Sequence, residues 1–243
     1  MSSLKKSFPD DKLPITPSPH KLKTPTFAFH SIMKKLLIDS QFLPPIEFFS
    51  ALTDHDEILL EAHEYFVKQT YRNRCYILGA KGPLRLIIPV KHGKGEKIPM
   101  KSVKIDYSTN WIKDHWRTIE SCYNKSPFFE HYKDAFKDIY DKKHENLWDI
   151  NREMLSLCLT LLGFEKIISS TKNFIQEGDN DLFSDQRGKI LPKKSFNYRK
   201  IYTPVTYFQM FGKTFVENLS IIDLLFCLGP ESSRVVTESK RQV

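Results

Sequence analysis

The stretch that decides the fold is LLIDSQFLPP, residues 36–45. Its first three residues form a short apolar run of the kind found in buried strands, and this run ends at Asp39. The pair Pro44-Pro45 stops the strand. Proline is tolerated in the first turn of a helix, because the N–H that it lacks has no partner there. We therefore expect a strand, a short polar turn and then a helix over residues 46–52.

Extended segments dominate the sequence that follows. Short strands are expected at residues 58–61, 65–69 and 102–107. Residues 72–78 alternate between polar and apolar side chains, and residues 84–90 form an apolar run after the turn Gly79-Ala80-Lys81-Gly82. Two such runs on either side of a glycine-containing turn predict a β-hairpin.

The period changes at Asn110, and helices are expected from there on. Large apolar side chains recur at spacings of three, four and seven residues up to Tyr123, which predicts an amphipathic helix. Further helices are expected at residues 126–140, 146–162 and 218–228, with a strand at 167–170 and an extended segment at 207–211. The polar stretch 176–200 is expected to be a long loop, and such loops are usually functional lids or disordered.

Together these elements predict an α+β protein, with a mixed β-sheet in the N-terminal half packed against a helical C-terminal half. We expect a single domain over residues 33–234. Residues 1–32 lack periodicity and are expected to be a disordered leader, or the product of a start codon upstream of Met33. Their deletion should leave folding intact. Residues 235–243 are expected to be a disordered tail.

The composition restricts the class of protein. The 243 residues are 40% hydrophobic and 13% aromatic, which is enough for a sizeable core and excludes wholesale disorder. No apolar run approaches the roughly 18 residues that a membrane-spanning helix needs. This argues against a transmembrane protein and is compatible with peripheral membrane contact. The net charge of +8 favours anionic partners such as phosphates or nucleotide-linked substrates.

Cysteine spacing and the lack of standard motifs limit the chemistry further. Cys75, Cys122, Cys158 and Cys227 show neither CxxC nor metal-type spacing, and no secretory apolar segment opens the sequence. We therefore expect a reduced, cytoplasmic protein with no metal site. The dinucleotide fingerprint, the P-loop and the HExxH and GxSxG motifs are missing as well, so no cofactor is expected.

A polar cluster lies between two expected strands, in the sequence KQTYRNR at residues 68–74. Arg72 and Arg74 each present a planar fork of donors that matches a carboxylate or a phosphate. Gln69 and Asn73 add hydrogen-bonding amides beside the guanidiniums. We interpret all four as candidate substrate-binding residues. The alternative is a solvated turn with surface salt bridges.

Gln41 is a further candidate for substrate binding. It comes between the end of the first expected strand and the start of the first expected helix. In α/β proteins with open parallel sheets, ligands commonly bind at this position.

His115 is the candidate catalytic base. On its expected helix it lies between Trp111 and Trp116. Partial burial there would disfavour the charged imidazole and leave a base near neutral pH. Tyr123, about two turns further along the same face, would assist it. The alternatives are a purely structural His115 and a nucleophilic pair of Cys75 with His115, which lacks a recognisable third group.

Several stretches together resemble the WbqC-like family of bacterial proteins, in the branch found in Bacteroidetes. The matching stretches are QFLPPIEFF (41–49), KQTYRNR (68–74), Gly82 with LIIPV (86–90), WIKDHWR (111–117), SPFF (126–129), YFQ (207–209) and NLSIIDLLF (218–226). The resemblance covers roughly residues 33–230. The order and spacing of the stretches make it more specific than any one of them.

The resemblance implies a role in the assembly of O-antigen or other cell-surface polysaccharides, since members of the family are associated with such gene clusters. It implies a transferase that moves an aminoacyl or acyl group, for example glycyl, to an amino sugar. The substrate would be a small molecule, or a sugar linked to a nucleotide or lipid diphosphate. Many relatives have a polar residue such as Asn where this chain has Cys75. That departure argues against a thiolate mechanism.

Two other classes of function stay open, so the sequence leaves undecided whether the chain is an enzyme. A non-catalytic binding or scaffold protein that recognises an anionic ligand or a protein partner would keep the Arg, Asn and Gln cluster but need no titrating base. Nucleic-acid binding agrees with the positive charge. However, no continuous Lys/Arg stripe and no known nucleic-acid motif supports it.

Overall fold

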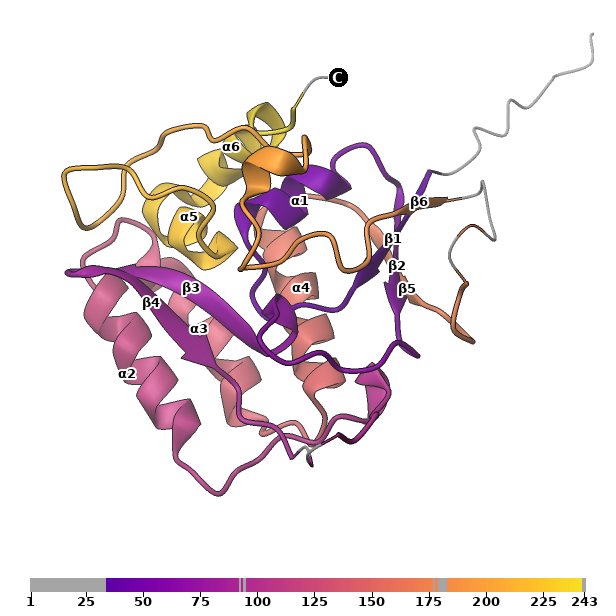
Figure 1. The fold of residues 1–243 in the computed structure, drawn as a ribbon. Coiled ribbons are helices and arrows are strands. Elements are labelled where there is room, and N and C mark those ends of the chain that lie inside the picture. The colour runs from indigo at the N-terminus through magenta and orange to yellow at the C-terminus, as the bar shows by residue number, and fades with distance from the viewer. Residues whose placement is uncertain (1–33, 92, 94, 177, 179–182, 242–243) are drawn as a thin grey trace, which may run out of the picture. The chain divides into compact units, whose positions relative to one another are not determined.

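A parallel sheet formed from both halves of the chain organises the fold (Figure 1). The computed structural model describes residues 34–91, 93, 95–176, 178 and 183–241. The strand order is β5-β2-β1-β6, and every neighbouring pair is parallel. The strands are β1 (Lys35–Asp39), β2 (Glu57–Glu61), β5 (Ile167–Ser170) and β6 (Phe183–Asp185).

The order of the strands reverses at β1. Helix α1 (Ile46–Leu52) leads from β1 to β2 on one side, whereas β6 pairs with β1 on the other side. Leu36, Leu37 and Ile38 of β1 are fully buried. Such a continuous apolar run is typical of a parallel strand that is covered on both faces.

A separate antiparallel hairpin packs beside the helices. It consists of β3 (Arg74–Gly79) and β4 (Gly82–Ile87). Helix α2 (Trp111–Tyr123) holds it at two points. The Tyr123 hydroxyl accepts a hydrogen bond from the Leu78 N–H (3.1 Å), and His115 Nε2 lies 3.0 Å from the Ile87 carbonyl oxygen.

The remaining helices build the core. They are α3 (Phe129–Asp141), α4 (Leu147–Leu161), α5 (Ile221–Leu228) and α6 (Ser232–Glu238), with short 3₁₀ turns η1 (Tyr71–Asn73), η2 (Met100–Ser102), η3 (Phe196–Tyr198) and η4 (Gly229–Glu231). Helix α5 is buried through seven consecutive residues and contacts α1, α3, α4 and α6. This explains its almost wholly apolar sequence.

The predicted α+β class is confirmed, with parallel and antiparallel strands in the first half of the chain and mainly helices in the second. The two kinds of pairing occur in separate sheets. Strands β5 and β6 reach back from the second half to complete the parallel one. The expected hairpin and the expected helices after Asn110 are present within a few residues of their predicted bounds.

Several expected elements differ from the structure. The strands predicted at 65–69 and 102–107 are wrong: they contribute only isolated bridges, Tyr65 with Pro99, Lys104 with Asn146 and Ile105 with Val90. The expected extended segment 207–211 forms no strand. The expected loop 176–200 contains β6, which is three residues long and pairs with β1. A strand this short has too few residues to show a period.

The C-terminal residues differ from the expected tail. Residues 235–238 belong to α6, where Val235 and Val236 are buried. The Ser239 carbonyl accepts a hydrogen bond from the Thr203 N–H (2.8 Å). The expected leader, residues 1–32, lies outside the described residues.

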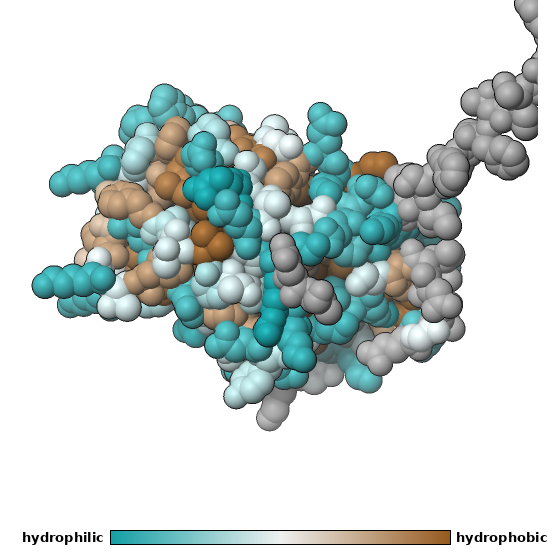
Figure 2. Space-filling model, turned by 90° about the horizontal axis from the view of Figure 1, so that it is seen from above, coloured by the Kyte–Doolittle hydropathy of each residue, from teal (hydrophilic) through white to brown (hydrophobic). Residues whose placement is uncertain are grey.

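Hydrophobic and hydrophilic residues are mixed at the surface of the protein. The face in Figure 2 shows hydrophobic patches among hydrophilic side chains. Phe208 and Tyr198 are among the exposed aromatic residues. In the part of the chain that the structure describes, no helix combines the length and apolar character needed to cross a bilayer.

Candidate functional site

The carboxyl ends of the parallel strands bring acidic side chains to one edge of the sheet. Asp39, Glu61 and Asp185 are the last residues of β1, β2 and β6. Asp39 and Glu61 are almost completely buried, so both carboxylates need donors from within the protein. Asp39 Oδ1 accepts from the Gly188 N–H (2.8 Å), and Glu61 Oε1 accepts from the Thr171 hydroxyl (2.7 Å).

The guanidinium of Arg72 lies at the same edge of the sheet and contacts two carboxylates. Its Nε and Nη2 donate to the two oxygens of Glu64, at 2.9 and 2.6 Å, and its Nη1 lies 3.7 Å from Asp39 Oδ2. The side chains of Arg72 and Glu64 are only 3% and 12% exposed. A bidentate pair of this kind fixes both groups in orientation.

Glu64 titrates near neutral pH in this position. Burial raises its pKa to about 7, the Arg72 guanidinium opposes this shift, and the neighbouring carboxylates of Asp39 and Glu61 add to it. A carboxyl group with a pKa near 7 can both accept and release a proton under physiological conditions, which is the property required of a general base or acid.

Arg187 brings a second guanidinium to the same edge. Its Nη1 donates to Glu61 Oε2 (3.0 Å) and to the Ile175 carbonyl (2.7 Å), and its Nη2 donates to Asp185 Oδ2 (2.6 Å). The sequence analysis did not single out Arg187. We call the following set the strand-end network: Asp39, Gln41, Glu61, Glu64, Arg72, Asp185 and Arg187.

Gln41 lies in this network, as its place after β1 suggested. Its Nε2 donates to Asp39 Oδ2 (2.9 Å) and to the Ile190 carbonyl (3.4 Å). Its Oε1 is buried and has no hydrogen-bond partner among the described residues. Buried polar atoms are rarely left unpaired, so this oxygen is a candidate acceptor for a substrate donor.

Asn73 connects the turn η1 to the end of the β3–β4 hairpin through its side chain. Its Nδ2 donates to the Ile88 carbonyl (2.8 Å), and its Oδ1 is a second buried amide oxygen without a partner in the described part of the chain. Asn151 of α4 donates to the Arg72 carbonyl (2.8 Å). These bonds hold the Arg72 backbone from two sides.

Arg74 and Gln69 lie within three residues of Arg72 in the sequence. Arg74 is partly buried; its Nε has no hydrogen-bond partner, and no carboxylate of the described residues forms an ion pair with its guanidinium. Gln69 is exposed and has a left-handed backbone (φ 63°) at the turn before η1. Arg74 therefore differs from Arg72, because its charge is not already neutralised by the protein.

His115 lies in an aromatic cluster and, among the described residues, forms no ring contact or hydrogen bond with a member of the strand-end network. Its ring packs against Phe42, Trp111 and Tyr140, with ring centroids 5.1 to 6.1 Å apart. Nε2 must carry the hydrogen because its neighbour, 3.0 Å away, is the carbonyl oxygen of Ile87. Nδ1 is then an acceptor, 3.5 Å from the Tyr140 hydroxyl. Burial lowers the pKa of His115 to about 4.

Tyr123 belongs to a different hydrogen-bonded group. Its hydroxyl donates to Asp223 Oδ1 (2.6 Å), and Asp223 Oδ2 accepts from Tyr207 (2.6 Å) and from Gln209 Nε2 (3.2 Å). Burial raises the pKa of Asp223. The structure thus brings Gln41, Arg72 and Asn73 together, places His115 in the aromatic cluster and places Tyr123 with Asp223.

Cys75 does not have the character of a nucleophile. It is fully buried, and burial raises its thiol pKa well above the usual range. The thiolate that would attack a substrate is therefore not populated at neutral pH.

Five members of the network were not predicted from the sequence: Asp39, Glu61, Glu64, Asp185 and Arg187. A signal for the first two was present, because the apolar runs of β1 and β2 both end in an acidic residue. Buried parallel strands that end in carboxylates place them at a common edge. Arg187 carried no such signal, since β6 lay hidden in the polar stretch.

Comparison with known protein families gives a match over most of the chain. The model of the WbqC-like protein family matches residues 39–190 and 192–235. The chain belongs to the WbqC-like protein family. Every member of the strand-end network lies within the first matched range.

A curated relative is similar to this chain over most of its own length. It is a protein of Mycobacterium tuberculosis (strain ATCC 25618 / H37Rv) named "Uncharacterized protein Rv1507c". The two chains are 25% identical over 224 residues, which cover 82% of this WbqC-like chain and 96% of the mycobacterial protein. No solved structure matches the chain.

Proposed function

We propose that this WbqC-like protein is a cytoplasmic transferase of cell-surface polysaccharide assembly of the O-antigen type. It would move an aminoacyl or acyl group, for example glycyl, to an amino sugar carried by a nucleotide or lipid diphosphate. The observation that carries the proposal is the Glu64–Arg72 pair, a carboxyl group of pKa near 7 fixed at the carboxyl edge of the parallel sheet. Family membership supports the polysaccharide context.

The proposed reaction assigns Glu64 as general base. The attacking amine forms a C–N bond to the acyl carbon, and the acyl donor's C–O or C–S bond breaks. The proton lost by the amine passes to Glu64 and from there to the leaving oxygen or sulfur. Arg72 acts as a positioning residue, because it holds both oxygens of Glu64.

Substrate binding is assigned to residues with unsatisfied groups. Arg74, whose charge is not neutralised by a carboxylate of the described residues, would hold the diphosphate or the donor's anion. The buried amide oxygens of Gln41 and Asn73 would accept hydrogen bonds from the sugar. Gln69, exposed at the adjoining turn, would contact the substrate from outside.

His115 is the alternative base, without the assistance expected from Tyr123, because the Tyr123 hydroxyl is bonded to Asp223. The pH profile of kcat/KM separates the two assignments. A base with a pKa of about 7 makes the rate fall below pH 7, whereas a base with a pKa of about 4 leaves it constant down to about pH 4. Under the alternative, His115→Ala lowers rate more than binding. Under either assignment, Arg74→Ala mainly weakens binding.

The test is turnover with a panel of activated acyl and aminoacyl donors and nucleotide-linked amino sugars. We expect Glu64→Gln to lower kcat by about 10²- to 10⁴-fold, the usual contribution of a general base. Glu145→Gln is the matched control, because Glu145 forms an exposed ion pair with Lys104. Equal activity of the two variants would remove Glu64 from the mechanism.

A binding or scaffold protein is the second candidate. One observation favours it: Arg72 and Arg187 are already paired with carboxylates of the protein, as in a purely structural network. Nucleotide-sugar binding without product under every donor tested would support this candidate and reject the transferase.

A further inference from the structure

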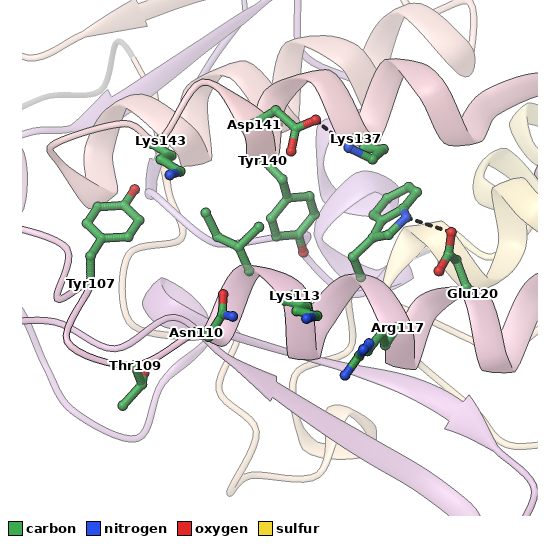
Figure 3. Close-up of a pocket in the computed structure, with 12 residues that line it drawn as sticks. Tyr107, Thr109, Asn110, Lys113, Arg117, Glu120, Lys137, Tyr140, Asp141 and Lys143 are labelled. Carbon is green, nitrogen blue, oxygen red and sulfur yellow. Dashed lines mark hydrogen bonds and ion pairs between the residues drawn. The ribbon is translucent and has the colours of Figure 1, made fainter.

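A pocket of about 500 Å³ lies between α2 and α3, away from the residues of the strand-end network (Figure 3). Its volume is within the range of small-molecule sites. Tyr140 extends from α3 toward α2 across its centre, and Tyr107 stands at one end. None of its lining residues takes part in the reaction proposed for Glu64.

The aromatic walls are held in place by hydrogen bonds. Trp116 Nε1 donates to Glu120 Oε1 (2.8 Å), and the Tyr107 hydroxyl donates to the His144 carbonyl (2.7 Å). The Trp116 and Tyr140 rings contact each other edge to face, with centroids 6.1 Å apart. Tyr107 is 38% exposed, whereas Trp116 and Tyr140 are 9% and 1% exposed. A ligand ring would therefore contact mainly Tyr107, whose hydrogen bond already orders it, and this lowers the entropic cost of binding.

The same pocket carries an excess of positive charge. Its lining includes the cations of Lys113, Arg117, Lys137 and Lys143, against the carboxylates of Glu120 and Asp141. Lys137 is paired with Asp141. In the described part of the chain, Lys113, Arg117 and Lys143 have no ion-pair partner. Lys113 and Arg117 are separated by four residues on α2, so their side chains lie one above the other.

Lys143 is positioned by its neighbours in sequence. Lys142 forms an ion pair with Glu153 of α4, and His144 Nε2 lies 2.7 Å from Glu153 Oε2. Lys143, between them, lines the α2–α3 pocket with a left-handed backbone (φ 50°). That conformation is uncommon for a residue with a side chain. The two contacts to Glu153 thus hold a strained residue that presents its amine to the pocket.

From these features we infer that the α2–α3 pocket is a binding site for a phosphorylated sugar or nucleoside. The unpaired cations suit a phosphate or diphosphate, and the ordered aromatic walls suit a ring. A neutral sugar would leave the cations uncompensated. The pocket is also too small for a polymer such as nucleic acid. The inference does not depend on the transferase reaction.

The test is calorimetric titration of the full chain with UDP-N-acetylglucosamine, N-acetylglucosamine 1-phosphate, N-acetylglucosamine and inorganic phosphate. We expect the two compounds that carry both a ring and a phosphate to bind at least about tenfold more tightly than the neutral sugar or phosphate alone, since only they combine a charge-assisted contact with a ring contact. Preference between those two distinguishes a nucleotide from a sugar phosphate as the natural source. Equal affinity of all four compounds, or no binding, would overturn the inference.

Variants locate the site. Arg117→Glu should weaken binding of the preferred compound at least about tenfold. Lys125→Glu should leave it unchanged, because Lys125 is an exposed cation beyond the C-terminal end of α2 and does not line the pocket. Equal effects of the two charge reversals would contradict the assignment and leave the transferase proposal standing.

Discussion

Two buried titratable groups, Glu64 in the strand-end network and His115 in the aromatic cluster, respond to the same physical cause in opposite directions. Burial raises the pKa of Glu64 to about 7 and lowers that of His115 to about 4. In both cases the low-dielectric surroundings disfavour the charged form. Glu64 therefore titrates near neutral pH, whereas His115 is uncharged at any pH well above 4.

Glu64 and His115 also differ in the groups that surround them. Glu64 faces a guanidinium that can share its charge, and part of its side chain reaches solvent. His115 is surrounded by rings and donates its one N–H to a backbone carbonyl. A buried ionisable group is suited to proton transfer when its surroundings support both of its states, and this condition favours Glu64 over His115.

The largest expected effect comes from removing the cation of the strand-end network. Arg72→Met leaves Glu64 and Asp39 buried without their counter-charge, so we expect a loss of about 3–5 kcal/mol in the free energy of unfolding, measured by urea denaturation. The double variant Arg72→Met/Glu64→Met should be more stable than Arg72→Met alone. If the double variant were the less stable one, charge compensation would not explain the pair.

The next effect is a pH dependence that originates in Glu64. Because its pKa is higher in the folded than in the unfolded chain, the folded state binds the extra proton, and stability falls as pH rises from about 4.5 to about 7. The slope is at most roughly 1.4 kcal/mol per pH unit. Glu64→Gln should remove this contribution, so that stability measured by denaturation across that range falls less, or rises more, with pH than in the unaltered chain; an unchanged slope would contradict the raised pKa.

His115 should contribute the opposite slope. Its pKa is lower in the folded chain, so its stability contribution is present above pH 6.5 and is lost as pH falls toward 4. Between about pH 4.5 and 6.5 the slopes that Glu64 and His115 contribute to the stability partly cancel each other. His115→Gln, which can still donate to the Ile87 carbonyl, should therefore unmask the decline due to Glu64, with a slope of similar size and opposite sign to that of Glu64→Gln.

The smallest expected effect on stability comes from an exposed ion pair, which serves as the reference for the buried pair of Arg72 and Glu64. Lys104 and Glu145 form a pair in which both side chains are largely exposed. We expect Lys104→Met to change the free energy of unfolding by less than about 1 kcal/mol, because such pairs are screened and mobile. A loss comparable to that of Arg72→Met would mean that burial is not what separates the two pairs.

Much of the fold could be predicted from the sequence because its signals are local. The apolar run of β1, the proline pair before α1, the hairpin turn and the helical period from Trp111 onward each depend on a few neighbouring residues. Strand β6 could not be predicted, because its three residues are strand only through their pairing with Lys35–Leu37.

The candidate site was predicted in part. Gln41, Arg72 and Asn73 lie together, since each occupies a turn at the end of a strand or between strands. The partners of Arg72 could not be identified, because Asp39 comes from a different strand and Glu64 from the irregular segment after β2. The partner of Tyr123 is a hundred residues away at Asp223, a separation that no local pattern encodes.

The position of β6 beside β1 has a consequence for synthesis of the protein. A ribosome adds about 5–20 residues per second, so the free side of β1 remains uncovered for roughly 10 s after β2 has been made. An uncovered strand readily pairs with another chain, and this nascent chain therefore passes through a stage at which it is prone to aggregate. A product that ends before Phe183 would keep that open strand permanently, and Glu61 would lack the neutralising charge of Arg187.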